Sequence, residues 1–169
     1  MRRIATIAWA LIALTPACGL RSGDDGGVTA PSTGGVRCGE PIPLRPTDLP
    51  LSMTPDLPAS VPAASADGLF RGRVTVTNRS AAPVRGTTAS TPDLFVTRAG
   101  IVVALPPPKI TLARTLDLAP GASETYAAAG SVAACSNGER LAAGRYEIHA
   151  EFPVDSLTVF AGPWPLDIT

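Results

Sequence analysis

Histidine is almost absent from the sequence: His149 is the single one among 169 residues. Nucleophilic catalysis by serine or cysteine requires a base beside the nucleophile and a third group that orients the base. With one histidine and no Gly-x-Ser-x-Gly motif, the sequence shows no such triad. Glycine-rich phosphate loops that follow a strand are absent as well, as are Asp-x-Asp-x-Asp-Gly calcium loops. We therefore expect no enzymatic activity, no cofactor and no bound metal.

Lysine is equally scarce, and the charges are balanced. Lys109 is the only lysine among 14 basic residues, and 14 acidic residues bring the formal net charge to zero. No segment clusters basic residues as a nucleic-acid-binding surface does. The composition therefore argues against nucleic acid as a partner.

The sequence also lacks an apolar run long enough to cross a bilayer as a helix, which takes ~20 residues. The run Ile4–Leu14 has only eleven residues, and it follows the basic pair Arg2 and Arg3. A basic start, a short apolar core and a small residue at Ala17 are the three parts of an export signal. Residues 1–17 are predicted to be a signal peptide.

Cys18 follows directly after Ala17, and two interpretations of this cysteine stand open. In the first, signal peptidase cuts after Ala17 and the product is an ordinary secreted protein. In the second, Ala17 and Cys18 are the last two residues of a lipobox, with Leu14 one place earlier than usual, and the thiol receives a lipid. A lipid with more than one acyl chain would hold the mature chain stably on the membrane.

The number of cysteines favours lipidation. The chain has three, and an unpaired thiol in an exported protein is unfavourable. If Cys18 carries the lipid, Cys38 and Cys135 can form a disulfide, which is the default in an oxidising compartment. Lipidation of Cys18 thus leaves no cysteine unpaired.

The segment after Cys18 is predicted to be a flexible tether. Residues 19–37 contain six glycines and almost no large apolar side chain. The expected organisation is therefore a signal peptide at 1–17, a lipid-anchored linker at 18–37 and one domain at 38–169. The expected location is the extracytoplasmic face of the cell membrane, with secretion as the alternative. The expected partners are the membrane, through the lipid, and an envelope or secreted protein; the oligomeric state has no signature in the sequence.

Proline and glycine, by contrast, are abundant, at 18 and 16 residues. Short segments with period-two apolar patterns recur between turn signals, which predicts an all-β protein, an immunoglobulin-like antiparallel β-sandwich of seven to nine strands. The last strand is expected at a sheet edge, because Pro163 and Pro165 cannot donate a ladder hydrogen bond. The expected strands are 49–53, 70–77, 83–90, 93–97, 101–105, 110–118, 124–129, 145–152 and 160–168.

Three of these segments predict which side chains face the core. In 70–77 the even-numbered residues are apolar or glycine, and the odd-numbered Arg71, Arg73, Thr75 and Thr77 are expected outward. In 110–118 the expected buried face holds Ile110, Leu112, Leu116 and Leu118. In 145–152 Tyr146, Ile148, Ala150 and Phe152 are expected inward, and Glu147, His149 and Glu151 outward on a solvated strand face. These three polar residues could bind a divalent cation only with ligands from other segments, which the sequence does not show.

Turn residues mark the connections. Residues 98–100 predict a hairpin, and residues 119–121 predict a proline–glycine turn. Asn78 ends its strand and begins a glycosylation triplet, which carries little weight in a protein of bacterial type. Tyr146, shortly after Gly144, is typical of a tyrosine corner.

Four segments together resemble the bacterial intracellular proteinase inhibitor (BsuPI-type) family: VTVTN at 74–78, the hairpin around Gly100, LAPGASETY at 118–126 and LAAGRYEIHAEF at 141–152. The resemblance covers about residues 68–153 and implies an immunoglobulin-like sandwich. It also implies proteinase inhibition as an alternative function. The family carries tryptophan and serine where this chain has residues 104–108 (ALPPP), so no inhibitory residue is transferred.

The sequence points to three candidate surfaces for binding. Residues 105–110 (LPPPKI) would form a loop stiffened by prolines, which suits an inhibitor. The outward arginine and threonine face of 71–77 would suit another macromolecule. Trp164 could be a recognition anchor or a plug at one end of the sandwich. The expected function is therefore a non-catalytic, lipid-anchored extracytoplasmic domain that binds protein or serves the envelope structurally.

Overall fold

The structure, a computed structural model, describes residues 35–43, 49–110 and 112–169. The predicted signal peptide, Cys18 and most of the predicted tether lie outside the described residues. No described residue belongs to a helix, so the described part of the chain offers no helical membrane span.

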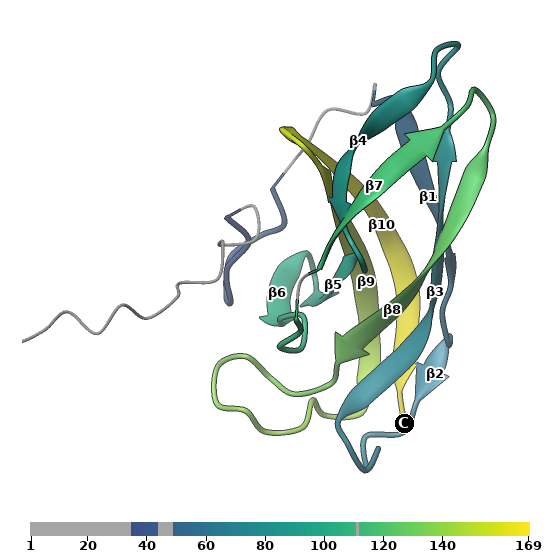
Figure 1. Cartoon of the computed structure of the whole chain (residues 1–169). Coiled ribbons are helices and arrows are strands. Elements are labelled where there is room, and N and C mark those ends of the chain that lie inside the picture. The colour runs from purple at the N-terminus through teal and green to yellow at the C-terminus, as the bar shows by residue number, and fades with distance from the viewer. Residues whose placement is uncertain (1–34, 44–48, 111) are drawn as a thin grey trace, which may run out of the picture. The chain divides into compact units, whose positions relative to one another are not determined.

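The described residues form ten strands (Figure 1). They are β1 (Leu51–Asp56), β2 (Ser60–Val61), β3 (Leu69–Asn78), β4 (Val84–Ala89), β5 (Asp93–Arg98), β6 (Ile101–Ala104), β7 (Ala113–Leu118), β8 (Ser123–Ser131), β9 (Gly144–Val154) and β10 (Leu157–Ile168).

The strands build two sheets that face each other. One sheet has the order β1-β3-β8, and the other has the order β2-β10-β9-β4-β7, with β5 pairing with β9 and β6. Figure 1 shows β1, β3 and β8 on the right of the view, β9 and β10 in the middle, and β5 and β6 on the left. Every pairing is antiparallel except that of β2 with β10. The predicted all-β sandwich is confirmed, with ten strands among the described residues where seven to nine were expected.

The core lies between the two sheets, and the predicted alternation decides which side chains enter it. Val74 and Val76 of β3 and Ile148 of β9 are completely buried, as the period-two pattern predicts. Tyr126 of β8 meets Phe152 of β9 edge to face, with ring centroids 4.8 Å apart. Arg71 and Arg73 point outward and are exposed, as predicted. Pairs of aromatic rings in this geometry stabilise a core beyond their burial alone.

The last strand, expected at an edge, is flanked on both sides. β10 pairs with β9 along its length and with β2 at Asp167 and Ile168. The prediction was wrong because the prolines prevent ladder hydrogen bonds only at their own positions and leave the end of the strand able to pair. Asp167 and Thr169 donate their N–H groups to Ala59 and Val61 on the β2 side, at 2.8 and 3.1 Å. Pro165, two residues earlier in the same alternation, has no N–H group to offer there.

The strand expected at 110–118 begins only at Ala113, and its predicted face is half wrong. Leu116 and Leu118 are buried as expected, but Ile110 is 85% exposed and Leu112 is 64% exposed. The chain reaches this strand from Pro106–Pro108, which can offer no ladder donors. Leu112 accepts the N–H of Ser90, the residue after β4, at 3.0 Å, and the pairing with β4 begins at Ala113. The first two apolar residues therefore lie before the paired region.

The predicted turns are present. β5 and β6 form a hairpin through Ala99 and Gly100, both with positive φ, and this is the backbone geometry that tight hairpins favour. Gly121, also with positive φ, lies in the connection from β7 to β8 at the upper right of Figure 1. Tyr146 donates its phenol hydrogen to the carbonyl of Ala142 at 2.8 Å, which confirms the tyrosine corner.

Asn78 ties the ends of both sheets together. Its side-chain Nδ2 donates to the carbonyl oxygens of Ala82 at 2.8 Å and Leu118 at 2.9 Å. Its Oδ1 accepts from the N–H and the hydroxyl of Ser80, at 2.9 and 2.8 Å. Asn78 is 0% exposed, so the glycosylation triplet is inaccessible in the folded protein. The residue that was predicted to end a strand also joins β3 to β7.

Replacing Asn78 by alanine is expected to lower the free energy of unfolding by about 3 kcal/mol, because buried carbonyl groups lose their donors. Urea denaturation measures the change. Asn137→Ala is the matched control: Asn137 is exposed, and among the described residues its side chain bonds Glu139 alone, so a loss below about 1 kcal/mol is expected. Equal losses for the two variants would contradict the role of Asn78.

Candidate functional site

The described residues line a wide, open depression, which we call the β1–β10 groove. Its volume is about 1010 Å³, and it lies where β1 of one sheet meets β10 of the other. Its walls are residues 41–43, 49 and 51–53, and 159–164, together with Gly100, Glu147 and His149. Most of these side chains are apolar, including Leu51, Met53 and Trp164.

Two polar side chains of β9 stand in this apolar lining. The Oε2 of Glu147 accepts the hydroxyl hydrogen of Thr97, a fully buried residue of β5, at 3.2 Å. The Nε2 of His149 is buried and has no hydrogen-bond partner among the described residues. Burial lowers the pKa of His149, and the negative charge of Glu147 opposes this shift only in part. The imidazole is therefore neutral near pH 7.

The predicted solvated face of β9 is wrong. Glu151 is only 2% exposed, and His149 and Glu147 are half-buried. In the sheet, Glu151 stands between Asp93 of β5 and Phe160 of β10, and His149 lies beside Phe95, which is 1% exposed. This face of the sheet is packed, so its polar residues are withdrawn from solvent. The described residues contain no group of three or more histidine, cysteine, aspartate or glutamate side chains that could hold a metal.

Gly162 shapes the groove beside His149. The register of β10 against β9 shifts between Ala161 and Trp164, and Gly162 lies in this irregularity with φ +113°. A β-carbon at Gly162 would lie 2.6 Å from the carbonyl oxygen of Ile148 and 3.2 Å from Nδ1 of His149. Only glycine allows β10 to approach the histidine this closely.

Trp164 is half-buried: it packs against the hydrophobic core and lines the groove, so it is not a free recognition anchor. It pairs with Ile148, the residue between Glu147 and His149. Because residues paired across a ladder share a face, Trp164 lies on the core face with Ile148, whereas Glu147 and His149 alternate to the opposite face of the sheet.

A second candidate surface is the proline segment, residues 105–110. Lys109 holds this segment to the body of the domain, because its Nζ lies 2.9 Å from Oδ1 of Asp93 and donates to the carbonyl of Thr91 at 2.8 Å. The next described residues, Ile110 and Leu112, are the most exposed large apolar side chains in the part of the chain that the structure describes. The contacts of Lys109 therefore hold the proline segment in place, and the segment exposes Ile110 and Leu112 to solvent.

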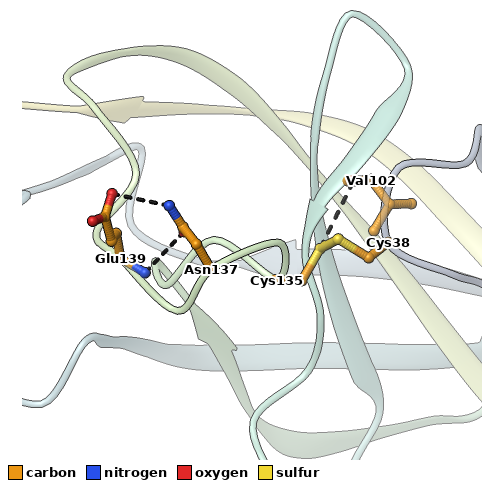
Figure 2. The surroundings of a disulfide bond; sticks show 5 residues. All are labelled: Cys38, Val102, Cys135, Asn137 and Glu139. Carbon is orange, nitrogen blue, oxygen red and sulfur yellow. Dashed lines mark hydrogen bonds between the residues drawn. A yellow bond between two sulfur atoms is a disulfide. The ribbon is translucent and has the colours of Figure 1, made fainter.

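The structure joins Cys38 to Cys135, 97 residues apart in sequence, with their α-carbons 5.9 Å apart (Figure 2). Around this bond the segment that precedes β1, residues 38–43 (the lead segment), pairs with β6. Gly39 donates to the carbonyl of Val102, and Val102 donates to that of Glu40, both at 2.9 Å. Figure 2 shows Val102 beside the disulfide and Asn137 bonded to Glu139 in the turn that follows Cys135. The disulfide thus fixes the segment that supplies residues 41–43 to the groove.

Sequence reasoning missed the groove. The alternation in β9 identifies Glu147 and His149, and the Gly162-Pro163 pair signals an irregular strand. Neither signal shows that β1 and residues 41–43 also line this groove, since the segments that meet there are about a hundred residues apart in the sequence. The sequence offers no local sign of such a pairing.

Neither a scan against protein-family models nor a search of the curated proteins finds a match. Among solved structures, the chain is similar to the crystal structure of a beta-glucosidase from Listeria innocua in complex with glucose, with a TM-score of 0.39 and 10% sequence identity. The similarity covers 70% of this chain and 16% of the beta-glucosidase chain. At these values it carries no argument about activity.

Removing the disulfide by the double change Cys38→Ser and Cys135→Ser is expected to lower the free energy of unfolding by about 4 kcal/mol, because the unfolded chain loses the closure of a long loop. Urea denaturation measures this, and reduction of the wild type should reproduce it. The bond does not form if reductant leaves the free energy of unfolding of the wild type unchanged, or if both cysteines react with an alkylating agent without prior reduction.

Proposed function

We propose that this chain is a non-catalytic, lipid-anchored extracytoplasmic domain that binds another envelope or secreted protein through the proline segment and the adjoining Leu112. The observation that carries the proposal is the exposure of Ile110 and Leu112, at 85% and 64%, on a base held by Lys109.

The anchor half of the proposal rests on the start of the chain. The basic pair, the short apolar run and Ala17-Cys18 suit a lipoprotein leader. The pairing of Cys38 with Cys135 is consistent with an oxidising compartment, and it leaves Cys18 as the remaining cysteine.

The binding half rests on the cost of exposed apolar surface. Burying an isoleucine or leucine side chain in a partner contributes about 1.5–3 kcal/mol each. Three consecutive prolines reduce the freedom of the segment, so that less conformational entropy is lost when a partner orders it. Lys109 is held by Asp93 and is not free to enter a partner's pocket, which leaves Ile110 and Leu112 as the contact residues.

The same features support proteinase inhibition of the BsuPI type as the second candidate. Inhibitors present a stiff, protruding segment whose exposed side chain enters the specificity pocket of the protease. Ile110 would fill that role here, and the pocket that accepts it would be apolar.

The anchor is tested by replacing Cys18 with serine in the full chain. The wild type is expected in the membrane fraction and labelled by radioactive fatty acid, and Cys18→Ser is expected to be unlabelled and released. Ser32→Ala, a change in the predicted tether, is the control and should behave as the wild type does. A wild type that takes up no label would overturn the anchor.

The binding surface is tested by a photoreactive amino acid placed at residue 110 or 112 of the chain in its own envelope, with Thr54, exposed on β1, as the control position. The same covalent adduct is expected at 110 and 112 and not at 54. With the probe at 112, Ile110→Ser should weaken the adduct about tenfold or more, which corresponds to about 1.4 kcal/mol or more. If the cross-linked partner is a protease, the result favours proteinase inhibition over the first candidate function. The absence of an adduct at 110 and 112, or equal adducts at all three positions, would contradict the proposed binding surface.

A further inference from the structure

β7 ends the larger sheet with one edge unpaired. Its even-numbered residues form the hydrogen bonds to β4, and the bond from the N–H of Ser90 to the carbonyl of Leu112 continues this ladder. Successive residues of a strand direct their main-chain groups to opposite edges, so Ala113, Thr115 and Asp117 direct theirs away from β4. These N–H and C=O groups have no hydrogen bond to a described residue. β7 therefore offers a row of free donors and acceptors with the spacing of a strand.

Three other strands that stand at sheet edges are blunted or covered. In β1 the backbone nitrogen of Pro55 faces the free edge and has no hydrogen to donate. The proline segment lines one depression together with residues 127–129 of β8, a strand whose only ladder is with β3. The lead segment pairs with β6 through Gly39 and Val102. Natural proteins protect sheet edges in such ways, but β7 contains no proline, and no described segment pairs with its outer edge.

The two charged side chains of β7 are both engaged by the chain itself. The Nε of Arg85 in β4 lies 3.1 Å from Oδ1 of Asp117, on the outer face of the sheet. Arg114 pairs with Glu124 of β8 and lies over the ring of Tyr126, with its guanidinium carbon 4.9 Å from the ring centroid. An inward charge on an edge strand opposes strand addition when it is left without a counter-charge, and here Glu124 supplies one.

Leu112 extends the inner face of β7 beyond the core. Alternation places it on the same face as Leu116 and Leu118, which are 0% and 4% exposed, whereas Leu112 is 64% exposed. A strand added beside β7 would bring a side chain next to Leu112, because paired strands carry their side chains on common faces. The same strand would thus satisfy the free main-chain groups and remove the leucine from water.

We propose that the partner of this domain binds by strand addition: an extended segment of another protein pairs with Ala113, Thr115 and Asp117 and covers Leu112 with an apolar side chain. Main-chain hydrogen bonds supply affinity in this binding mode, and alternate side chains supply specificity. The mode rests on the proposed function, because it states how the partner meets the surface at Leu112. The partner segment must be free of proline at the positions that donate to β7.

Cross-link positions test the register of the added strand. A photoreactive amino acid is placed at residue 113 or 117 of the full chain in its own envelope, as at residue 112 above. Both positions are exposed and lie on the outer face of β7. The protein captured at 112 is expected at both, and mass spectrometry should place the two cross-linked sites in the partner about four residues apart, because paired strands advance together. Contact through the proline segment alone would not produce this spacing.

Removal of one main-chain donor tests the hydrogen bonds. Thr115→Pro deletes an N–H group that β4 does not use, and it should reduce the adduct at residue 112 about tenfold or more. Thr115→Val keeps the N–H group and should give as much adduct as the wild type. Thr125→Pro is the matched control and should also leave the adduct unchanged, because Thr125 is exposed and directs its N–H group away from β3. Urea denaturation checks that each variant folds.

Three results would overturn strand addition: a folded Thr115→Pro chain that keeps the full adduct at residue 112, partner sites that do not keep their spacing between the probes at 113 and 117, or capture of a second copy of this chain. The spacing measurement uses no proline variant, so it decides the matter even where Thr115→Pro fails to fold. Absence of any adduct at residue 112 of the wild type would instead contradict the proposed function itself.

Discussion

The missing N–H group of proline is the constraint on which the limits of both sheets depend. Every second residue of β10 directs its N–H group toward β2. Pairing with β2 starts only at Asp167, because Pro165, two residues earlier, has no N–H group to donate. In β1 the even-numbered residues make the hydrogen bonds to β3. The backbone nitrogen of Pro55 therefore faces the free edge of the sheet, where no N–H group is needed. Pro106–Pro108 take the chain out of the ladder altogether before β7. The prolines therefore set where strands stop and which segments stay accessible.

The two candidate surfaces follow from these interruptions. The proline segment is presented to solvent because it cannot join a sheet, and Lys109 fixes it against Asp93. The β1–β10 groove lies where the register of β10 against β9 shifts between Ala161 and Trp164, with Gly162 close against His149. The disulfide then brings the lead segment across to form another wall. Each surface thus lies where the regular hydrogen-bond ladder is interrupted.

Much of the fold could be predicted from local patterns. The alternation in β3 and β9 correctly places Val74, Val76 and Ile148 in the core, and the glycine of the β5–β6 hairpin marks a real turn. The errors concern what lies beyond one strand. Ile110 and Leu112 fit a strand pattern but precede the paired region, and Glu151 alternates outward into a face that other segments cover. Periodicity reports which side of a strand a residue occupies, but it does not report whether that side meets water.

The amino-acid sequence by itself determined the all-β class, the turns and the side of each strand that faces the core, because these depend on neighbours within a few residues. It also supplied the three cysteines, of which Cys38 and Cys135 pair in the structure. Only the tertiary structure decided that Glu147, His149 and Trp164 share a groove with β1, and that Asn78 joins the ends of two sheets. Those arrangements require segments far apart in the chain to meet, and the register that brings them together is set by packing over the whole core.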